Sequence, residues 1–240
     1  MPSEPHPPRK PTLRTWTWRI ERGPPLPLAH ALRIGEAMQD MLKETARLLR
    51  GSRELPPSLE GPTPNHSHAR YLPKDRDGDG LVDHLTVFAS GGLDAPAIRL
   101  LALSDRLALP GSGFYDLEPL IAGEAPPLSL AGSARHWVSL TPYVAPWPGH
   151  SFQEHVRREL VLIGAANKET ARHVTVEPVH VLERSKPSAF DLVREDDKPP
   201  MPPHAGFLQL ELPTPLPGPL VLGYGSHFGL GQFACAGTAG

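Results

Sequence analysis

The sequence predicts an α+β protein built from two small modules in tandem, and three observations lead to this fold class. Short segments that alternate apolar and polar residues, the pattern of strands, are interleaved with segments of helical period. The 31 prolines and 22 glycines among 240 residues leave few proline-free windows long enough for a helical bundle or a coiled coil. A hydrophobic share of 39% with a net charge of −2 is typical of a folded chain rather than a disordered one. The length suffices for two domains of roughly 100 residues each.

The first module is expected over residues 12–123, after a flexible, proline-rich arm of residues 1–11. A helix is predicted over 28–50, because apolar residues recur there every three or four positions between Pro27 and Gly51. The other expected elements are a strand at 12–22, a hairpin of 69–72 and 82–89, a helix at 95–107 and a strand at 113–121. This β-α-β-β-α-β order over 12–122 is the ferredoxin-like order.

The second module is expected over residues 134–235. Ser151 and Glu154 have the spacing of a capping box and predict a helix that starts there and ends before Gly164. Strands are expected at 135–140, 173–183, 207–212 and 219–222. Because this order partly repeats the first, we predict a second ferredoxin-like module that ends in a glycine-rich loop.

Composition narrows the function classes. The single cysteine, Cys235, excludes a disulfide within the chain and a cysteine-based zinc site. No apolar run approaches the ~20 residues that span a bilayer, so a cytoplasmic protein without a membrane partner is expected. The net charge of −2 does not indicate a nucleic-acid-binding protein, although residues 1–53 hold ten Lys/Arg against five Asp/Glu. On the first predicted helix, Lys43, Arg47 and Arg50 share a face that either contacts phosphate or is merely solvated.

The densest polar cluster is Asn65-His-Ser-His-Ala-Arg-Tyr-Leu-Pro73. In a strand, His66 and His68 would face the same side and could present two imidazoles to one pocket. Paired histidines suit general acid–base work, since the imidazole pKa lies near operating pH. Metal ligation, phosphodiester transesterification and a solvated surface loop are all compatible with this spacing.

Four aspartates follow in Asp75-Arg-Asp-Gly-Asp-Gly-Leu-Val-Asp83. They occupy positions 1, 3, 5 and 9 of an EF-hand-type loop, with glycine at position 6. Position 12 is Thr86 rather than the bidentate glutamate, and the flanks read as strands. Ca²⁺ binding by Asp75, Asp77, Asp79 and Asp83 is therefore one interpretation, and the tight turn of a hairpin is the other. His84 lies at the start of the return strand.

A second glycine-rich stretch, Gly223-Tyr-Gly-Ser-His-Phe-Gly-Leu-Gly-Gln-Phe233, lies near the end of the chain. Its glycines free the backbone for a close approach by a ligand, and successive N–H groups can form a nest for phosphate. Tyr224, His227 and Phe228 could stack on bases. The alternative is a final strand kinked by glycine.

Taken together, these stretches resemble one CRISPR-associated family of the RAMP superfamily. His66–Leu85, Thr141–Val144 and Gly223–Phe233, with weaker agreement across 24–50, are similar to the fused repeat-associated protein of type I-U (I-G) systems. That family joins a CRISPR subunit to an endoribonuclease that processes precursor crRNA in antiviral defence. The resemblance implies RRM-type ferredoxin-like modules, a glycine-rich loop that holds RNA, and metal-independent cleavage of CRISPR repeat RNA without a cofactor.

The implied mechanism is attack by a ribose 2′-OH on the adjacent phosphorus, which gives a 2′,3′-cyclic phosphate and a 5′-OH. We expect His68 or His66 to be the base, assisted by the other of the two, by His84 or by Tyr71. His30, at the start of the first helix, is a rival, and His136 and His227 are outsiders. The RNA-binding candidates are Arg70, Arg47, Arg50, Gly223, Tyr224, Gly225, His227, Gly229 and Gly231.

Two other functions remain open at this stage. A non-catalytic subunit that holds crRNA, with other subunits of a type I effector complex as partners, would bind repeat RNA without cleaving it. A calcium-stabilised β-rich protein would instead respond to Ca²⁺ through the aspartate loop. The two classes differ in whether RNA or Ca²⁺ is the ligand.

Overall fold

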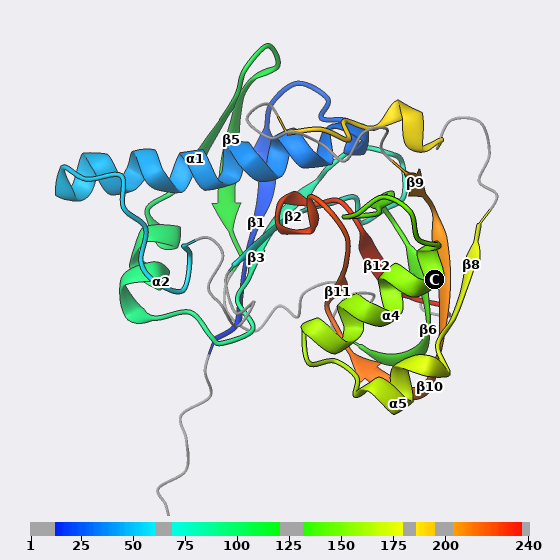
Figure 1. Ribbon diagram of the computed structural model, residues 1–240. Coiled ribbons are helices and arrows are strands. Elements are labelled where there is room, and N and C mark those ends of the chain that lie inside the picture. The colour runs from blue at the N-terminus through cyan, green and yellow to red at the C-terminus, as the bar shows by residue number, and fades with distance from the viewer. Residues whose placement is uncertain (1–12, 61–68, 121–131, 180–185, 195–203, 237–240) are drawn as a thin grey trace, which may run out of the picture.

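The structure is a computed structural model, and it describes residues 13–60, 69–120, 132–179, 186–194 and 204–236. The chain forms two halves, residues 13–120 and 132–236, each with its own five-stranded antiparallel sheet and with helices packed against it (Figure 1). The fold is thus α+β, as predicted. The predicted arm of residues 1–11 lies outside the described residues.

The first half has the expected β-α-β-β-α-β order, with one strand more. Its elements are β1 (Thr15–Arg22), α1 (Ala31–Arg50), β2 (Arg70–Lys74), β3 (His84–Phe88), α2 (Ala95–Ala102), β4 (Arg106–Leu109) and β5 (Gly113–Pro119), with a 3-10 turn η1 (Leu28–His30) before α1. The strands lie in the order β2-β3-β1-β5-β4. β4 is the added strand at the sheet edge, paired with β5 in a hairpin.

The predicted helix at 95–107 is too long. It ends at Ala102, and the next residues turn into β4. Within β4, Leu107 and Leu109 are buried while Arg106 and Ala108 are exposed, so the segment follows the period of a strand. A four-residue strand is too short for its alternation to stand out beside a helical pattern.

One long helix supplies most of the cover for the first sheet. α1 runs for 20 residues and ends at Gly51, whose φ of 72° places it in the left-handed region that glycine adopts readily. Its apolar face, with Leu32, Met38 and Leu42 fully buried, packs over Trp18 and its neighbours. Figure 1 shows α1 crossing the strands of this sheet.

The second half repeats the strand order but not the helices. Its elements are β6 (Ser133–Ser139), β7 (Tyr143–Val144), α4 (Phe152–Leu162), α5 (Lys168–Arg172), β8 (Thr175–Pro178), β9 (Ala205–Gly206), β10 (Leu208–Pro217), β11 (Leu220–Val221) and β12 (Gln232–Cys235), with 3-10 turns η3 (Pro187–Ala189) and η4 (Ser226–Phe228). The sheet order is β11-β12-β6-β10-β8, and β7 pairs separately with β9. The capping box of Ser151 and Glu154 starts α4 as predicted. The strand expected at 173–183 is shorter, since β8 spans Thr175–Pro178 without His173, Val174 and Val179, and residues 180–183 lie outside the described ranges.

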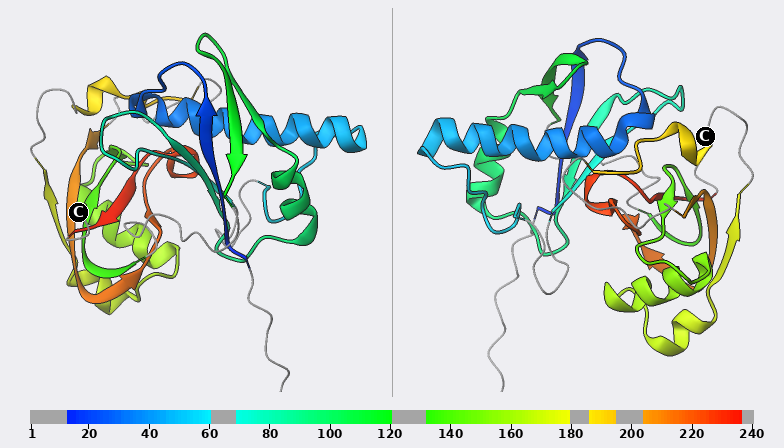
Figure 2. Two further views of the ribbon diagram at one scale, coloured as in Figure 1. Left: turned by 180° about the vertical axis from the view of Figure 1, so that it is seen from behind. Right: turned by 45° about the horizontal axis from the view of Figure 1, so that its top comes forward.

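The glycine-rich stretch occupies the place where a second helix would complete the repeated order. Between β10 and β12 the chain forms only β11 and the turn η4. Phe228 and Leu230 of this stretch belong to the hydrophobic core of the first half, together with Val144. In both views of Figure 2 the red segment that contains η4 lies between α1 and the rest of the second half. The two halves therefore meet at this stretch.

Candidate functional site

The first sheet has one apolar face and one polar face. The register places Lys74 of β2 opposite His84 of β3, and His84 opposite Arg19 of β1, so these three residues share a face. Thr17 and Thr86 lie on the same face and share a hydrogen bond of 3.1 Å. The alternate residues, among them Trp18, Tyr71 and Val87, lie on the face that α1 covers.

His84 and Tyr71 consequently lie on opposite faces, and the structure does not bring them together. His84 is buried, and its Nδ1 is 2.9 Å from Asp83 Oδ1. The Tyr71 ring stacks against Phe228, and its hydroxyl donates to the carbonyl oxygen of Leu59 at 2.9 Å. Burial raises the pKa of Tyr71. Because the Tyr71 ring is buried and its hydroxyl is engaged, its position favours packing over proton transfer.

The predicted catalytic pair His66 and His68 lies outside the described residues. The described chain resumes at Ala69, one residue before β2 begins. Their assignment therefore stays a prediction.

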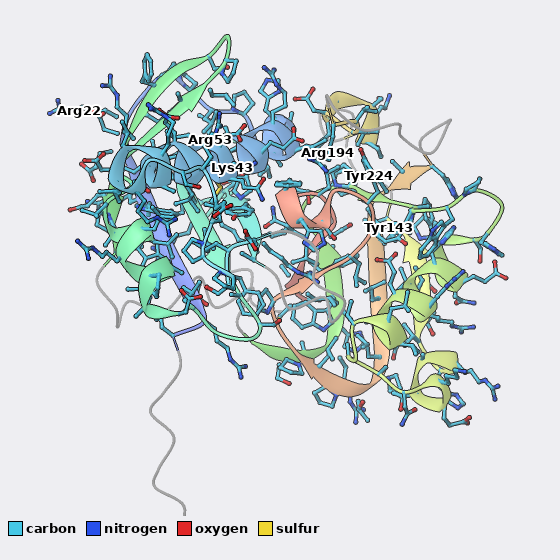
Figure 3. All side chains as sticks on the ribbon, turned by 60° about the vertical axis from the view of Figure 1, so that its left-hand side comes forward. Arg22, Lys43, Arg53, Tyr143, Arg194 and Tyr224 are labelled. Atoms are coloured by element: carbon cyan, nitrogen blue, oxygen red, sulfur yellow. The ribbon has the colours of Figure 1, made fainter. Side chains whose placement is uncertain are left out.

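Arg70, a predicted RNA contact, lies in a buried polar network that crosses between the halves. Its Nη1 donates to the carbonyl oxygen of Val221 at 2.5 Å, and burial lowers its pKa to about 10 while the charge of Glu159 partly offsets the effect. Glu159 of α4 accepts two hydrogen bonds of 2.6 Å, from the Tyr143 hydroxyl and from the Gly223 N–H. Burial raises the pKa of Glu159, chiefly by desolvation. Arg70 thus holds β2 to the second half, and Figure 3 marks Tyr143 on that side.

The glycines of the terminal stretch permit close packing. A Cβ on Gly231, whose φ is 59°, would lie 1.7 Å from the carbonyl oxygen of Leu222. A Cβ on Gly229 would lie 2.7 Å from the Pro73 ring. Gly35 of α1 meets the stretch from the other side, since its Cβ would lie 2.4 Å from the carbonyl oxygen of Phe228. Side chains at these positions would collide with neighbouring atoms, so the glycines allow the two halves to pack closely.

The backbone of this stretch is largely engaged within the protein. Tyr224 N–H donates to Val144, Phe228 and Leu230 N–H both donate to Gly225, and Gly231 N–H donates to Pro142. A phosphate nest needs N–H groups that are turned outward. These N–H groups are therefore not available to form a phosphate nest. Tyr224, Gly225 and His227 are half-buried, and their predicted contact with RNA stays a prediction.

A cleft of about 490 Å³ opens between the two halves. Its walls come from η1, from the end of β2 and the hairpin tip, from the end of β6, and from β12. Among the lining residues are Leu28, Pro73, Lys74, Thr141, Phe207 and Gln232. A cleft with mostly apolar walls and few polar groups is typical of a ligand site.

A histidine–aspartate pair flanks this cleft. His30 ends the turn before α1 and directly follows Ala29, which lines the cleft, and Asp191 directly follows the lining residue Phe190. The Nδ1 of His30 is 2.8 Å from Asp191 Oδ2, and the two side chains are 37% and 34% exposed. The N–H of Asp191 also donates to the carbonyl oxygen of Ala29 at 3.0 Å, which fixes the segment against η1. Sequence reasoning named His30 only as a rival and missed Asp191, which carries no local motif.

The basic face of α1 is exposed, and much of it is paired. Arg47 bonds to Glu44 at 2.5 Å, and Lys43 lies 3.3 Å from Asp40. Arg50 donates to the carbonyl oxygen of Glu54 at 2.7 Å. Figure 3 marks Lys43 on α1 and Arg53 in the segment that follows the helix. These pairs are exposed and weak, so a phosphate could replace the partners at little cost.

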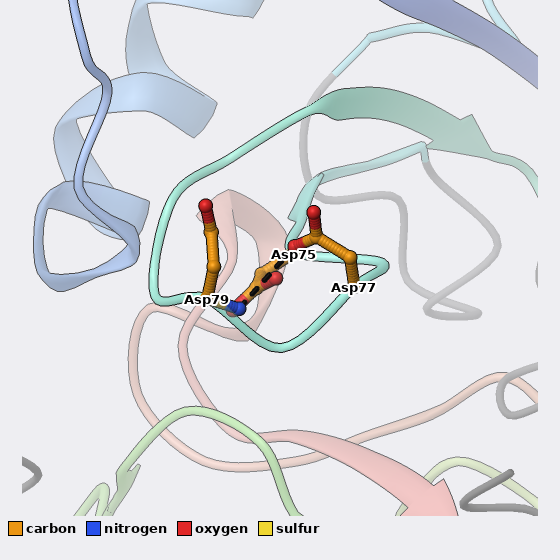
Figure 4. Close-up of side chains that lie close together, drawn as sticks. All are labelled: Asp75, Asp77 and Asp79. Carbon is orange, nitrogen blue, oxygen red and sulfur yellow. Dashed lines mark hydrogen bonds between the residues drawn. The ribbon is translucent and has the colours of Figure 1, made fainter.

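The aspartate loop forms the tip of the hairpin between β2 and β3 (Figure 4). Asp75, Asp77 and Asp79 have carboxylate oxygens within 4.8 Å of one another. Both oxygens of Asp75 already accept backbone N–H groups, from Gly78 at 2.7 Å and from Gly80 at 2.8 Å. Asp83, the fourth predicted ligand, instead accepts from the Arg76 N–H and from His84. This pattern favours the turn interpretation.

Comparisons with known proteins give only distant likenesses. No protein family and no curated protein matches the chain. Among solved structures, a Cas6 product complex is 16% identical, with a TM-score of 0.44, over 92% of this chain and 98% of that one. A RAMP protein binding different RNA substrates is 12% identical, with a TM-score of 0.41, over 92% and 97%. A Cas6-related protein from Pyrococcus furiosus is also 12% identical, with a TM-score of 0.41, over 95% and 100%. Likenesses this weak carry no functional argument by themselves.

Among the described residues, no helix is both long and apolar enough to cross a membrane.

Proposed function

We propose that this chain is an endoribonuclease that cleaves CRISPR repeat RNA to mature crRNA, and that the cleft between its halves holds the RNA. The observation that carries the proposal is the His30–Asp191 pair beside this cleft, with a separation of 2.8 Å between Nδ1 and Oδ2. The sequence motifs described above support the same function. The other subunits of a type I effector complex are the proposed partners.

We also propose that both halves are RRM-type ferredoxin-like modules in tandem. The support comes from the strand order. With the strands of each sheet numbered in chain order, the first sheet reads two-three-one-five-four across β2-β3-β1-β5-β4, and the second reads the same across β8-β10-β6-β12-β11. The glycine-rich stretch stands in the second module where the first has its second helix, α2.

His30 is the proton-transfer residue in this proposal. With Nδ1 held by Asp191, Nε2 is the ring nitrogen left for proton transfer. A carboxylate on Nδ1 stabilises the tautomer whose proton is on Nδ1, which leaves Nε2 as the proton acceptor. Asp191 is then a positioning residue, since it acts through His30.

The reaction needs no group beyond these side chains and the RNA. Nε2 takes the proton of a ribose 2′-OH, and the 2′-oxygen forms a bond to the adjacent phosphorus. The P–O5′ bond breaks, and the leaving 5′-oxygen takes a proton from an acid. The products are a 2′,3′-cyclic phosphate and a 5′-OH. His66 and His68 are the proposed candidates for the acid.

The proposal is tested with repeat RNA from a CRISPR array of the source genome, incubated with the protein in EDTA. His30→Ala should lower the cleavage rate by roughly 10²–10⁴-fold, the usual contribution of a positioned acid or base. Asp191→Asn should lower it less, because the His30 ring loses the carboxylate that orients it and fixes its tautomer.

His173→Ala is the matched control. His173 is also an exposed histidine beside a carboxylate, 3.6 Å from Glu169, but it lies at the end of α5. It should cleave like the wild type. Normal cleavage by His30→Ala would contradict the assignment of His30 as the proton-transfer residue. Absence of cleavage by the wild type would contradict the proposed endoribonuclease activity.

A second candidate function is a subunit that binds crRNA without cleaving it. It is favoured by one observation, namely that Tyr71 and Arg70 of the predicted site are engaged in packing within the fold. The same assay separates the two functions. The binding subunit would retain repeat RNA on a filter or a gel and would yield no cyclic-phosphate product.

A further inference from the structure

Lys74, the last residue of β2, is a buried cation at the wall of the cleft. The residue is part of the cleft lining, and it is only 3% exposed. Lysine is rarely buried to this degree unless its charge is paired. The position is therefore costly for the free protein and needs an explanation.

The described part of the chain offers this ammonium group no carboxylate. None of the ion pairs among the described residues includes Lys74. Among the described residues that line the cleft, the only other charged one is Asp75, and both of its oxygens accept backbone N–H groups of the hairpin tip. Across the sheet, Lys74 faces His84, which is bonded to Asp83. Burial alone lowers the pKa of Lys74, and no neighbouring charge opposes the effect.

The ammonium group is nevertheless held in a defined position. Its Nζ donates to Gln232 Oε1 at 2.6 Å. The orientation of that amide is fixed in turn, because its Nε2 donates to the carbonyl oxygens of Pro73 at 3.1 Å and Gly229 at 2.8 Å. A lysine ammonium has three N–H donors, and among the described residues one acceptor is found for it. Its other two donors have no acceptor among the described residues.

We propose that Lys74, oriented by Gln232, binds one backbone phosphate of a single-stranded RNA in the cleft. This inference rests on the proposed function, since it names a contact to the same substrate. A phosphate supplies the negative charge and the acceptors that the site lacks. Because a phosphate is present at every nucleotide, this contact positions the strand and does not read its sequence.

The test uses the full chain and a fluorescent 2′-O-methyl RNA of the repeat sequence, which has no free 2′-OH and cannot be cleaved. Lys74→Met should weaken binding about tenfold or more, the usual effect of losing a hydrogen bond to a charged group. It should also lower the slope of log affinity against log salt by about 0.7, the value for one phosphate contact on a single strand. Lys168→Met, on exposed α5, should leave both unchanged.

Protein stability separates this role from a purely structural one. If Lys74 only joins the halves through Gln232, Lys74→Met should lower the free energy of unfolding, and affinity should fall only as far as folding does. If Lys74 is a phosphate ligand, Lys74→Met should leave stability equal or raise it, since it removes a buried charge without a partner. Should Lys74→Met fail to fold, Lys74→Gln keeps a donor toward Gln232 and gives the same readouts.

Unchanged affinity and salt slope in a folded variant would overturn the inference, as would no binding of this RNA by the wild type. Failure of the proposed function looks different. In that case the wild type binds the 2′-O-methyl RNA in a Lys74-dependent manner but never cleaves repeat RNA. This result would support the phosphate contact and contradict only the proposed cleavage activity.

Discussion

The two halves share a strand order and differ in what covers their sheets. In the first, α1 and α2 pack against the sheet and supply much of its core. In the second, α4 and α5 occur, but the segment between β10 and β12 is glycine-rich and contributes Phe228 and Leu230 to the core of the first half. The place where the second half departs from the repeat is thus the place where the halves join.

The comparison shows where a ligand site arises in such a pair. A second helix would need a broad apolar face to cover its own sheet. The glycine-rich stretch instead runs close to α1 and β2, and β12, which follows it, places Gln232 beside Lys74 at the cleft. Binding residues therefore come from both halves, although each half has its own core.

The largest expected effect on stability comes from removing the buried cation that crosses between the halves. Arg70→Met removes a buried charge that stabilises ionised Glu159 and a donor to Val221, and should lower the free energy of unfolding by about 3–5 kcal/mol. Arg157→Met is the matched control, because Arg157 also donates to a carbonyl oxygen, that of Val174, but within the second half. Its cost should be about 1–3 kcal/mol. Chemical denaturation measures both, and equal costs would contradict a special role for the contact between the halves.

A smaller loss of stability is expected when a methyl group is added at Gly231, where two backbone segments pack most closely. Gly231→Ala should cost about 2–3 kcal/mol, because its Cβ meets the carbonyl oxygen of Leu222 and the backbone is left-handed. Gly51→Ala has a similar φ, 72°, with nothing within 4 Å of the added Cβ, and should cost about 1 kcal/mol. Thermal unfolding of the two variants isolates the packing contribution. A loss at Gly231 no larger than at Gly51 would contradict the close packing.

The pH dependence of stability should reveal Lys74. Its pKa is lowered in the folded protein, so between that value and the ordinary value of ~10.4 the unfolded chain binds more protons. Stability contributed by this group therefore rises as pH increases through that window. The charged groups near it are His84 on β3, Arg19 beyond it on β1, and Asp75 at the hairpin tip.

The measurement is a series of denaturation curves from neutral pH to about pH 10, on the wild type and on Lys74→Met. The free energy of unfolding of the wild type should increase relative to that of Lys74→Met as pH rises. A constant difference would mean that the ammonium group is not desolvated.

The smallest effect on stability is expected on the exposed face of α1. Arg50→Ala should change the free energy of unfolding by less than about 0.5 kcal/mol, since the side chain is exposed. If this face contacts the RNA backbone, the same variant should lower the salt slope of RNA binding by about 0.7. Fluorescence anisotropy at several salt concentrations measures it. An unchanged slope would show that Arg50 makes no contact with the RNA backbone.

Local patterns made much of the fold predictable. α1, the capped start of α4 and the hairpin of β2 and β3 follow from periodicity, caps and turn residues that lie close together in the sequence. β4 was missed because four residues carry too little pattern, and the absent second helix was not anticipated because a strand was expected there. The glycines stand out in the sequence, but the carbonyl oxygens of Leu222 and Phe228 that require them are placed by the tertiary fold.

The candidate site was less predictable for the same reason. Asp191 meets His30 across 161 residues, and Gln232 meets Lys74 across 158. No motif marks such pairs. Lys74 looks like an ordinary surface lysine in the sequence, and only its place at the joint between two sheets buries it. His66 and His68 remain predictions on their motif.

The most direct test of the central proposal is the chemistry of the RNA ends after incubation of the wild-type protein with repeat RNA in EDTA. The proposal predicts one cut per repeat, a 5′-OH on the downstream fragment and a 2′,3′-cyclic phosphate on the upstream fragment, with all three lost in His30→Ala. A 3′-OH with a 5′-phosphate, or intact RNA that stays bound to the wild type, would contradict it.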